Sequence, residues 1–451
     1  MKKLSITLLV SILIFNVSFA QEKKQKQEKE DKIKTGWTFG AVPAIAYDSD
    51  LGFKYGALVN FYNYGDGKNY PKYLQSLYLE MSRTTKGNGI NRIFFDSENM
   101  FPNKAIRITA DLSYLTEKAL DFYGFNGYQA AYIKDFSDED SDDYISRMYY
   151  RMDRNIFKFT TDFSGKISNN LKWLAGFAHY NHKMSSVDFD NLNKGKDEND
   201  DDFLIDTITL FDKYVNNGFI SEEESDGGII NYIKLGTVYD TRDNEANPMQ
   251  GIWSEAIITT APSFLGNQEN SYTKLSLTHR QYFTILPKKL SFAYRLGYQG
   301  TIAGNAPFYM QPYLVSSFSR SSLTEGLGGS KSLRGIVRDR IVGDGIIYSN
   351  FEFRWKCIKT VVFNQNLYIA LSTFMDAGQI VDEIEIDRLM VPEDENTNDY
   401  FDTSKDELHI SYGAGVHFAL NENFIVAIDY GIAKDKRDGD KGLYIGMNFL
   451  F

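Results

Sequence analysis

Cysteine and histidine, which serve most often as nucleophile, base or transition-metal ligand, are few in this chain of 451 residues. There is one cysteine, Cys357, and there are five histidines: His179, His182, His279, His409 and His417. One cysteine excludes an intramolecular disulfide and any metal site built from several cysteines. His179 and His182 lie three residues apart in a segment that reads as a strand, so they point to opposite faces and cannot share a metal ion. The sequence has no H-E-x-x-H, G-x-S-x-G or P-loop pattern, and we expect no enzyme, no cofactor and no metal site.

Charge and hydropathy limit the partners that the chain can have. It carries 49 Lys and Arg against 60 Asp and Glu, a formal net charge of −11, which gives no electrostatic reason to expect a nucleic acid. Residues 1–20 combine Lys2 and Lys3 with a short apolar stretch and small residues before position 21, which is the pattern of a secretory signal peptide. Beyond them no apolar run approaches the about 18 residues of a membrane-spanning helix. Residues 21–34 are polar and indicate a short periplasmic tail.

From residue 35 onward the dominant pattern is alternation of apolar and polar residues. Clear rows are Leu290, Phe292, Tyr294, Leu296 and Tyr298, and, at the C-terminus, Leu443, Ile445, Met447, Phe449 and Phe451. Period two places each row on one face of a strand. A soluble sandwich would turn these rows inward, whereas an outer-membrane barrel would turn them toward lipid, and periodicity does not choose between the two.

Three features of the context favour the barrel. The chain is predicted to be exported, and many segments reach the roughly ten residues that a tilted strand needs to cross the hydrocarbon. Short and long connections also alternate, as they do in outer-membrane barrels. The short ones are Phe101–Lys104, Ile167–Asn170, Leu286–Lys289 and Asn421–Asn423, and the long ones lie near Glu117–Ser146, Ser185–Gly228, Thr301–Asp344 and Val381–Glu407. We predict an all-β fold over residues 35–451: a transmembrane antiparallel barrel of about 16 strands, with short periplasmic turns and long outer loops.

The long connections are acidic. The runs 135–143 and 196–202 could be considered calcium sites, but neither has an ordered ligand spacing with a central glycine, and we interpret both as solvated loops. Residues 203–217 carry apolar side chains at helical spacing, which predicts a surface helix capped by Asp202 and ended by Gly218.

A cluster of turn-forming residues follows one long strand. Its members are Asp240, Arg242, Asp243, Asn244, Asn247, Pro248 and Gly251. Side chains of these types bond to nearby backbone and hold a tight turn. The cluster resembles the periplasmic turn between the eighth and ninth strands of the BamA/TamA superfamily of outer-membrane barrels (bacterial surface antigen type).

A second resemblance to that superfamily lies in residues 329–336, Gly-Ser-Lys-Ser-Leu-Arg-Gly-Ile. The resemblance implies that the sixth outer loop folds into the lumen, where Arg334, followed by Gly335, meets Glu352 and Asp376. Alternation places Glu352 on the lumenal face independently, because Phe351 and Phe353 beside it would face lipid. Ile336 stands where the family usually has an aromatic residue.

The C-terminus resembles the insertion signal of outer-membrane barrels. The residues that carry it are Tyr444, Gly446, Phe449 and Phe451. The resemblance implies that the chain depends on the barrel-insertion machinery for its own assembly. It covers about residues 35–451, without the periplasmic POTRA domains of the family's core members.

Taken together, the resemblance implies an integral protein of the Gram-negative outer membrane that acts in outer-membrane biogenesis. It would assemble or translocate proteins or lipids, with the lipid bilayer around it and separate periplasmic partners or client proteins. Arg334 would either only pin the loop or set a loop conformation that handling a client requires. The alternative is a passive or substrate-selective, porin-like channel, since about 16 strands suffice for an aqueous pore.

Overall fold

The computed structural model describes residues 35–451 apart from 45, 49–51, 69–72, 99, 101–105, 246, 268–269, 318–325, 363–364, 404, 421–423 and 448. The predicted signal peptide (1–20) and tail (21–34) lie outside the described residues, as do the predicted turns at 101–104 and 421–423. None of the helices in the described part of the chain is long and apolar enough to cross a membrane.

The described residues form one antiparallel sheet. Its strands are β1 (Trp37–Pro43), β2 (Ala46–Asp48), β3 (Gly52–Asn63), β4 (Gln75–Thr84), β5 (Gly89–Ser97), β6 (Ile106–Asp121), β7 (Arg151–Lys166), β8 (Leu171–Ser185), β9 (Gly227–Asp240), β10 (Gly251–Ala261), β11 (Tyr272–Leu286), β12 (Leu290–Gly304), β13 (Gly345–Val362), β14 (Gln365–Asp382), β15 (His409–Leu420), β16 (Phe424–Ala433) and β17 (Lys441–Met447). From β3 onward each strand pairs with the next one along the chain.

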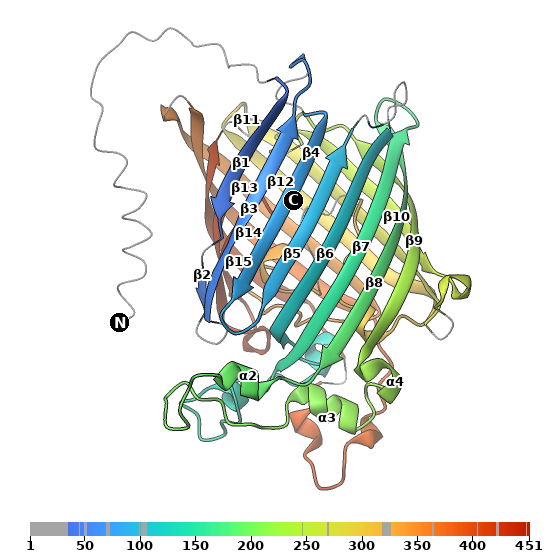
Figure 1. Ribbon diagram of the computed structural model, residues 1–451, viewed down its shortest axis with the longest axis vertical. Coiled ribbons are helices and arrows are strands. Elements are labelled where there is room, and N and C mark those ends of the chain that lie inside the picture. Colours follow the sequence, from blue (N-terminus) through green and yellow to red (C-terminus); the bar gives the residue numbers. More distant parts are fainter. Residues whose placement is uncertain are drawn as a thin grey trace.

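The first two strands are one interrupted strand. β1 pairs with β3 from Trp37 opposite Asn63 to Pro43 opposite Ala57, and β2 continues in the same register. Counting β1 and β2 together, the 17 described strands become 16, and the prediction of an all-β antiparallel barrel fold with this strand number is confirmed. Figure 1 shows the tilted strands curling round, with the later strands behind the earlier ones.

Short turns and long loops lie at opposite ends of the strands. At one end the connections are as short as 167–170 and 287–289. At the other end are the loops 122–150, 186–226, 305–344 and 383–408. Figure 1 shows the helices α2 (Phe189–Asn193), α3 (Leu210–Asn216) and α4 (Glu222–Ser225) gathered at this long-loop end.

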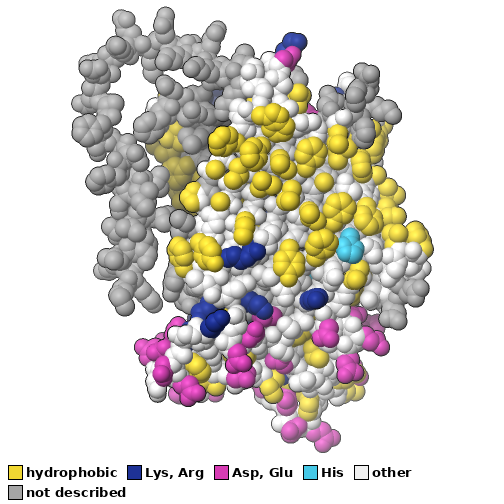
Figure 2. Space-filling model, viewed as in Figure 1, with side chains coloured by type: hydrophobic (Ala, Val, Ile, Leu, Met, Phe, Trp, Pro, Cys, Tyr) yellow, Lys and Arg dark blue, Asp and Glu magenta, His cyan; other side chains and the backbone are white. Residues whose placement is uncertain are grey.

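The two faces of the wall have opposite chemistry. On β13, Phe353 and Trp355 are each 49% exposed, whereas Glu352 and Arg354 between them are buried. Figure 2 shows apolar side chains over the outer surface of the strands and Asp and Glu side chains gathered at the long-loop end. Apolar groups therefore face the side where lipid would lie, and charged groups face the lumen.

The last residues depart from the predicted row. Leu443 and Ile445 are 65% exposed, but Phe449 and Phe451 are only 7% and 8% exposed. β17 ends at Met447, and the prediction that both phenylalanines continue its outward row is wrong. A lumenal arginine explains the change: Arg354 Nη2 donates to the Phe451 carbonyl at 2.9 Å, and its guanidinium lies 4.3 Å from the Phe449 ring centre.

The predicted surface helix is also shorter than expected. α3 begins at Leu210, and its cap is Thr209, not Asp202. Thr209 and Asp212 form a reciprocal capping box, which satisfies backbone donors at the helix start more completely than a lone aspartate can. Gly218, with φ +76°, follows the helix end as predicted.

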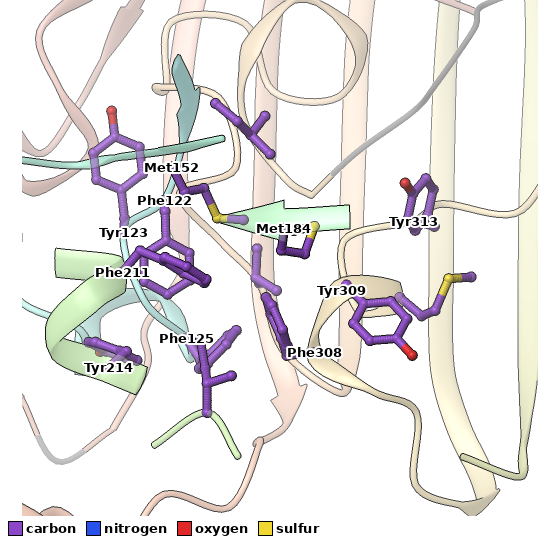
Figure 3. Close-up of a cluster of buried hydrophobic side chains, with 14 of the residues drawn as sticks. Phe122, Tyr123, Phe125, Met152, Met184, Phe211, Tyr214, Phe308, Tyr309 and Tyr313 are labelled. Carbon is purple, nitrogen blue, oxygen red and sulfur yellow. The ribbon is translucent and has the colours of Figure 1, made fainter. Parts of the chain in front are cut away.

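Aromatic side chains of several long loops pack into one buried cluster, which we call the mouth cluster. Figure 3 shows Phe122, Phe125, Phe211, Tyr214 and Phe308 converging from the 122–150 loop, α3 and the 305–344 loop. The Phe122 ring meets those of Phe211 and Tyr214 edge-on, with centres 5.6 and 5.3 Å apart. Such edge-to-face pairs add about 0.5–1.5 kcal/mol each to the burial of the rings. The long loops thus form a packed cap on the barrel.

Candidate functional site

The 305–344 loop reaches the wall of the lumen. In its second half, Leu327 and Ile341 exchange backbone hydrogen bonds of 3.0 and 3.1 Å, so the intervening residues form a closed tip. Leu333 and Ile336 in this tip are fully buried against Ile380 of β14 and their neighbours. Burial of these apolar side chains on either side of residue 334 fixes the direction in which its side chain points.

Arg334 lies among three carboxylates from three strands. It makes a two-pronged contact with Asp376 of β14, through Nε at 3.0 Å and Nη2 at 3.2 Å. Its Nη1 lies 3.3 Å from Glu352 of β13 and 3.4 Å from Asp429 of β16. The guanidinium also covers the Phe374 ring, 3.5 Å from its centre. Burial alone would lower the pKa of Arg334, but Asp376 and Glu352 outweigh burial and raise that pKa above its usual value.

Gly335 fits a place where a larger residue would not. Its φ is +101°, and a Cβ there would lie 2.6 Å from the backbone nitrogen of Ile432 on β16. Its own N–H donates to the Tyr444 hydroxyl of β17 at 2.9 Å. Glycine therefore allows the tip to press against the backbone of the wall. The structure thus brings Arg334, Gly335, Glu352 and Asp376 together, with Tyr444 beside them.

Asp429 is a site residue that sequence reasoning missed. It bonds to His417 of β15 at 3.1 Å while it faces Arg334. The signal was present, because an acid at the centre of an apolar strand, flanked by Ile428 and Tyr430, is expected to face the lumen.

The first half of the 305–344 loop contacts a neighbouring part of the wall. Gln299 of β12 donates through Nε2 to the Tyr313 carbonyl at 2.6 Å and accepts from Val315 N–H at 2.9 Å. Lys274 of β11 donates to Gln311 at 2.6 Å. No sequence motif marked these residues, since glutamine, tyrosine and lysine have many other uses in a strand or loop.

The predicted turn motif lies between β9 and β10, which are the eighth and ninth of the 16 strands. Asp240 accepts from Arg242 Nε at 3.0 Å, and Asp243 accepts from Met249 N–H at 3.0 Å. Asn244 accepts from Asn247 N–H at 2.9 Å. Side chains therefore hold this turn through its own backbone.

Two further residues connect the turn to its surroundings. The buried Asn247, which precedes the buried Pro248, donates to the hydroxyl of Tyr368 on β14. Gly251 has φ +106°, and a Cβ there would lie 2.4 Å from the Thr241 carbonyl oxygen, so glycine allows β10 to start close against the turn. The turn lies at the short-turn end, apart from Arg334 and its partners.

The residues of the predicted C-terminal signal are divided between two places. Tyr444 and Gly446 belong to β17, where Gly446 pairs with Ala427. Phe449 and Phe451 leave the strand and pack against Arg354, whose Nε also bonds to Glu352 at 3.2 Å. The Glu352 carboxylate therefore contacts both Arg334 and Arg354, and Arg354 in turn contacts the C-terminal phenylalanines.

The histidines lie apart. His179 bonds to Asn231 at 2.7 Å and His182 to the Tyr313 hydroxyl at 2.9 Å, so the two share no partner. His409 contacts Asp438 at 2.6 Å and Asp406 at 2.9 Å at the long-loop end.

Comparison with known proteins gives a family and a fold. The Omp85 superfamily domain matches residues 74–451. CdiB from Escherichia coli is similar in structure, with a TM-score of 0.53 and 10% sequence identity over 92% of this chain and 63% of that one. The crystal structure of BamA from Haemophilus ducreyi lacking POTRA domains 1-3 gives a TM-score of 0.49 and 14% identity, over 92% of this chain and 69% of that one. This chain thus spans about two thirds of the length of either. No curated protein matches it.

Proposed function

The chain belongs to the Omp85 superfamily, and from this premise we propose that it acts in outer-membrane biogenesis, assembling or translocating proteins or lipids. It is an outer-membrane β-barrel of that family. In our proposal the short turns face the periplasm and the long loops face outward. The protein carries out no covalent chemistry of its own, and export depends on the signal peptide at 1–20.

One observation supports the role most directly: Arg334, 1% exposed in its side chain, faces Asp376, Glu352 and Asp429. A charge-assisted, two-pronged pair in a shielded place fixes a loop in one geometry. We propose that this contact holds the sixth outer loop in the lumen and keeps the barrel closed to passive flow. The held loop sets the conformation in which the barrel handles a client.

The proposed partners follow from the same residues. The exposed rows, such as Phe353 and Trp355, contact the lipid bilayer. Tyr444, Gly446, Phe449 and Phe451 are read by the barrel-insertion machinery before the chain folds. Client proteins, or a separate periplasmic partner, approach from the short-turn end.

Depletion of the protein tests the role. Cells that lose it should show altered amounts of folded outer-membrane proteins or lipids, measured by quantitative mass spectrometry and lipid analysis. Re-expression of the wild type should restore both, whereas an Arg334→Ala variant present at equal level should not. Unchanged profiles after depletion would refute a role in biogenesis.

The alternative, a passive or substrate-selective channel, draws support from the charged inner wall. Arg92 and Lys158 both bond to the buried Asp111, at 2.8 and 3.0 Å, which is a polar lining of the kind that pores use. Conductance in planar bilayers separates the two functions. We expect small, irregular currents from the wild type, and steady large currents would favour the channel.

A further inference from the structure

A cavity of about 860 Å³ lies between three long loops, outside the contacts of Arg334. The 122–150 loop contributes Phe125, Asn126 and Gln129, the 186–226 loop contributes Phe219, and the 383–408 loop contributes most of the remaining lining. The volume is in the range of roughly 300–1,000 Å³ that ligand pockets commonly have.

Hydrogen bonds hold the cavity in a defined shape. The side chain of Asn126 donates to Ile384 O and accepts from Ile384 N–H, both at 2.8 Å, which fixes the 383–387 segment against the neighbouring loop. The cavity is continuous with the mouth cluster, since Phe125 and Phe401 belong to both. These contacts make the cavity pre-formed, which lowers the entropic cost of binding a ligand.

One wall of the cavity is aromatic. The Phe219 and Phe401 rings meet edge-on with centres 5.5 Å apart. Met390, 48% exposed, lines the cavity as well, and its neighbour Leu389 is 92% exposed. These side chains and the two rings give this side of the cavity an apolar surface on which an apolar group of a ligand can pack.

The other wall is acidic. Glu383, Glu385 and Asp387 line the cavity and are exposed. Arg388, the one base among the described lining residues, already donates to Gln129 Oε1 at 3.1 Å and to Thr403 O at 2.9 Å. The cavity therefore presents uncompensated negative charge next to apolar rings.

Gln129 is a structural part of the cavity edge. Its side chain is 6% exposed, and its Oε1 accepts from Arg388 Nη2 at 3.1 Å. Its Nε2 has no hydrogen-bond partner among the described residues and is enclosed by protein, so a bound molecule does not reach it. Recognition in the cavity therefore depends on the aromatic and acidic walls.

We propose that this cavity binds a basic segment of another protein at the cell surface. A large apolar side chain of the segment lies on Phe219 and Phe401, and lysine or arginine side chains face Glu383 and Glu385. This site goes beyond the role in biogenesis and stands even if that role is refuted.

Fluorescence anisotropy of the full-length barrel in detergent micelles tests the proposal with three labelled heptapeptides. One alternates lysine with phenylalanine, the second replaces lysine with glutamate, and the third replaces phenylalanine with serine. The lysine–phenylalanine peptide should bind with saturation and weaken as salt is added, because exposed charges are screened. Equal binding of either other peptide, or no saturable binding, would overturn the proposal.

Substitutions at the cavity locate the binding. Glu383→Gln with Glu385→Gln should weaken binding of the lysine–phenylalanine peptide about tenfold, since both carboxylates face the ligand's charges. The matched control, Glu198→Gln with Asp201→Asn, removes the same charge from exposed positions of the 186–226 loop and should leave binding unchanged. If the Glu383→Gln, Glu385→Gln variant and this control bind the peptide equally well, the peptide binds elsewhere on the protein. Heat-modifiable gel mobility verifies that each variant is folded.

Discussion

The two halves of the 305–344 loop contact neighbouring parts of the barrel wall by different means. Before residue 318 the contacts with β8–β12 are hydrogen bonds spread over several side chains of the wall, such as Gln299 to the Tyr313 carbonyl at 2.6 Å. After residue 325 the contacts with β13–β17 centre on Arg334, which faces three carboxylates. The first half divides its polar contacts among several side chains of the wall, whereas the second half gathers its ionic contacts at one side chain.

This difference indicates which half of the loop a single substitution can release from the wall. Removing a neutral hydrogen bond costs about 0.5–1.5 kcal/mol, and the remaining bonds still hold the first half. Removing one partner of a buried ion pair costs about 3–5 kcal/mol, because the other charges stay buried without compensation. The second half is therefore the part whose release a single change can cause.

Of these substitutions, Arg334→Ala should cause the largest loss in the free energy of unfolding. It leaves Asp376, Glu352 and Asp429 side by side without their shared cation, and the free energy of unfolding should fall by about 3–5 kcal/mol. Urea titration of the barrel in micelles measures this loss, and limited proteolysis should cut within 305–344 more readily.

The matched control is Arg92→Ala on β5. It also removes a buried arginine, but Asp111 keeps Lys158 at 3.0 Å. We expect a smaller loss of stability and no change in proteolysis of the loop. Equal losses for the two variants would show that Arg334 has no special place in holding the loop.

Gly335→Ala should cause the second-largest loss in the free energy of unfolding. A Cβ at φ +101° is strained and would press on the Ile432 backbone, and such strain costs about 1–3 kcal/mol. Gly195→Ala separates the two causes, since Gly195 has φ +81° but nothing within 4 Å of a Cβ. If urea titration gives the same loss for both glycines, close approach to β16 contributes nothing.

A rise in pH should loosen only the second half. His409 contacts both Asp438 and Asp406, and a neutral imidazole, with one N–H, can donate to only one of them. Asp438 also accepts from Tyr128 at 2.7 Å, and its carbonyl accepts from Val337 of the loop at 2.9 Å. At about pH 5.5 free aspartates are still ionised, and a protonated His409 can donate to both carboxylates. Raising the pH removes one imidazole proton and therefore one of the two hydrogen bonds. The local stability should then fall by about 1–2 kcal/mol.

Hydrogen–deuterium exchange measures this effect. Exchange in 326–344 and 434–440 should rise with pH beyond its intrinsic dependence, while 305–317 should not respond. A His409→Gln variant should lose the pH dependence. An equally large rise of exchange in 305–317 would contradict the expectation that only the second half of the loop responds to pH.

The sequence predicted the framework of the barrel for a definite physical reason. Alternation reports which face of a strand a residue occupies, so Glu352 could be assigned to the lumen from Phe351 and Phe353 alone. The pairing of Arg334 with Asp376 was only implied by family resemblance, because no local pattern tells which of several lumenal acids a loop residue meets.

Other parts depend on contacts between distant residues. Phe449 and Phe451 continue the alternation in sequence, yet Arg354, about 100 positions earlier, draws them into the lumen. Asp429 lacked a motif and was missed, although its place in an apolar strand was visible. The apolar spacing predicts a helix start at residue 203, whereas the capping box of Thr209 and Asp212 sets the start at Leu210.

Tyr313→Phe should cause the smallest loss in the free energy of unfolding. It tests most directly whether several separate hydrogen bonds hold the first half of the loop. It removes the hydroxyl that bonds to His182 at 2.9 Å but keeps the ring, whose centre lies 5.4 Å from that of Tyr180. The backbone bonds of Gln299 with Tyr313 and Val315 are untouched. The free energy of unfolding should fall by about 0.5–1.5 kcal/mol, and proteolysis within 305–344 should not change. A loss near that of Arg334→Ala would mean that the first half also depends on one contact, and the loop would then have two points of release instead of one.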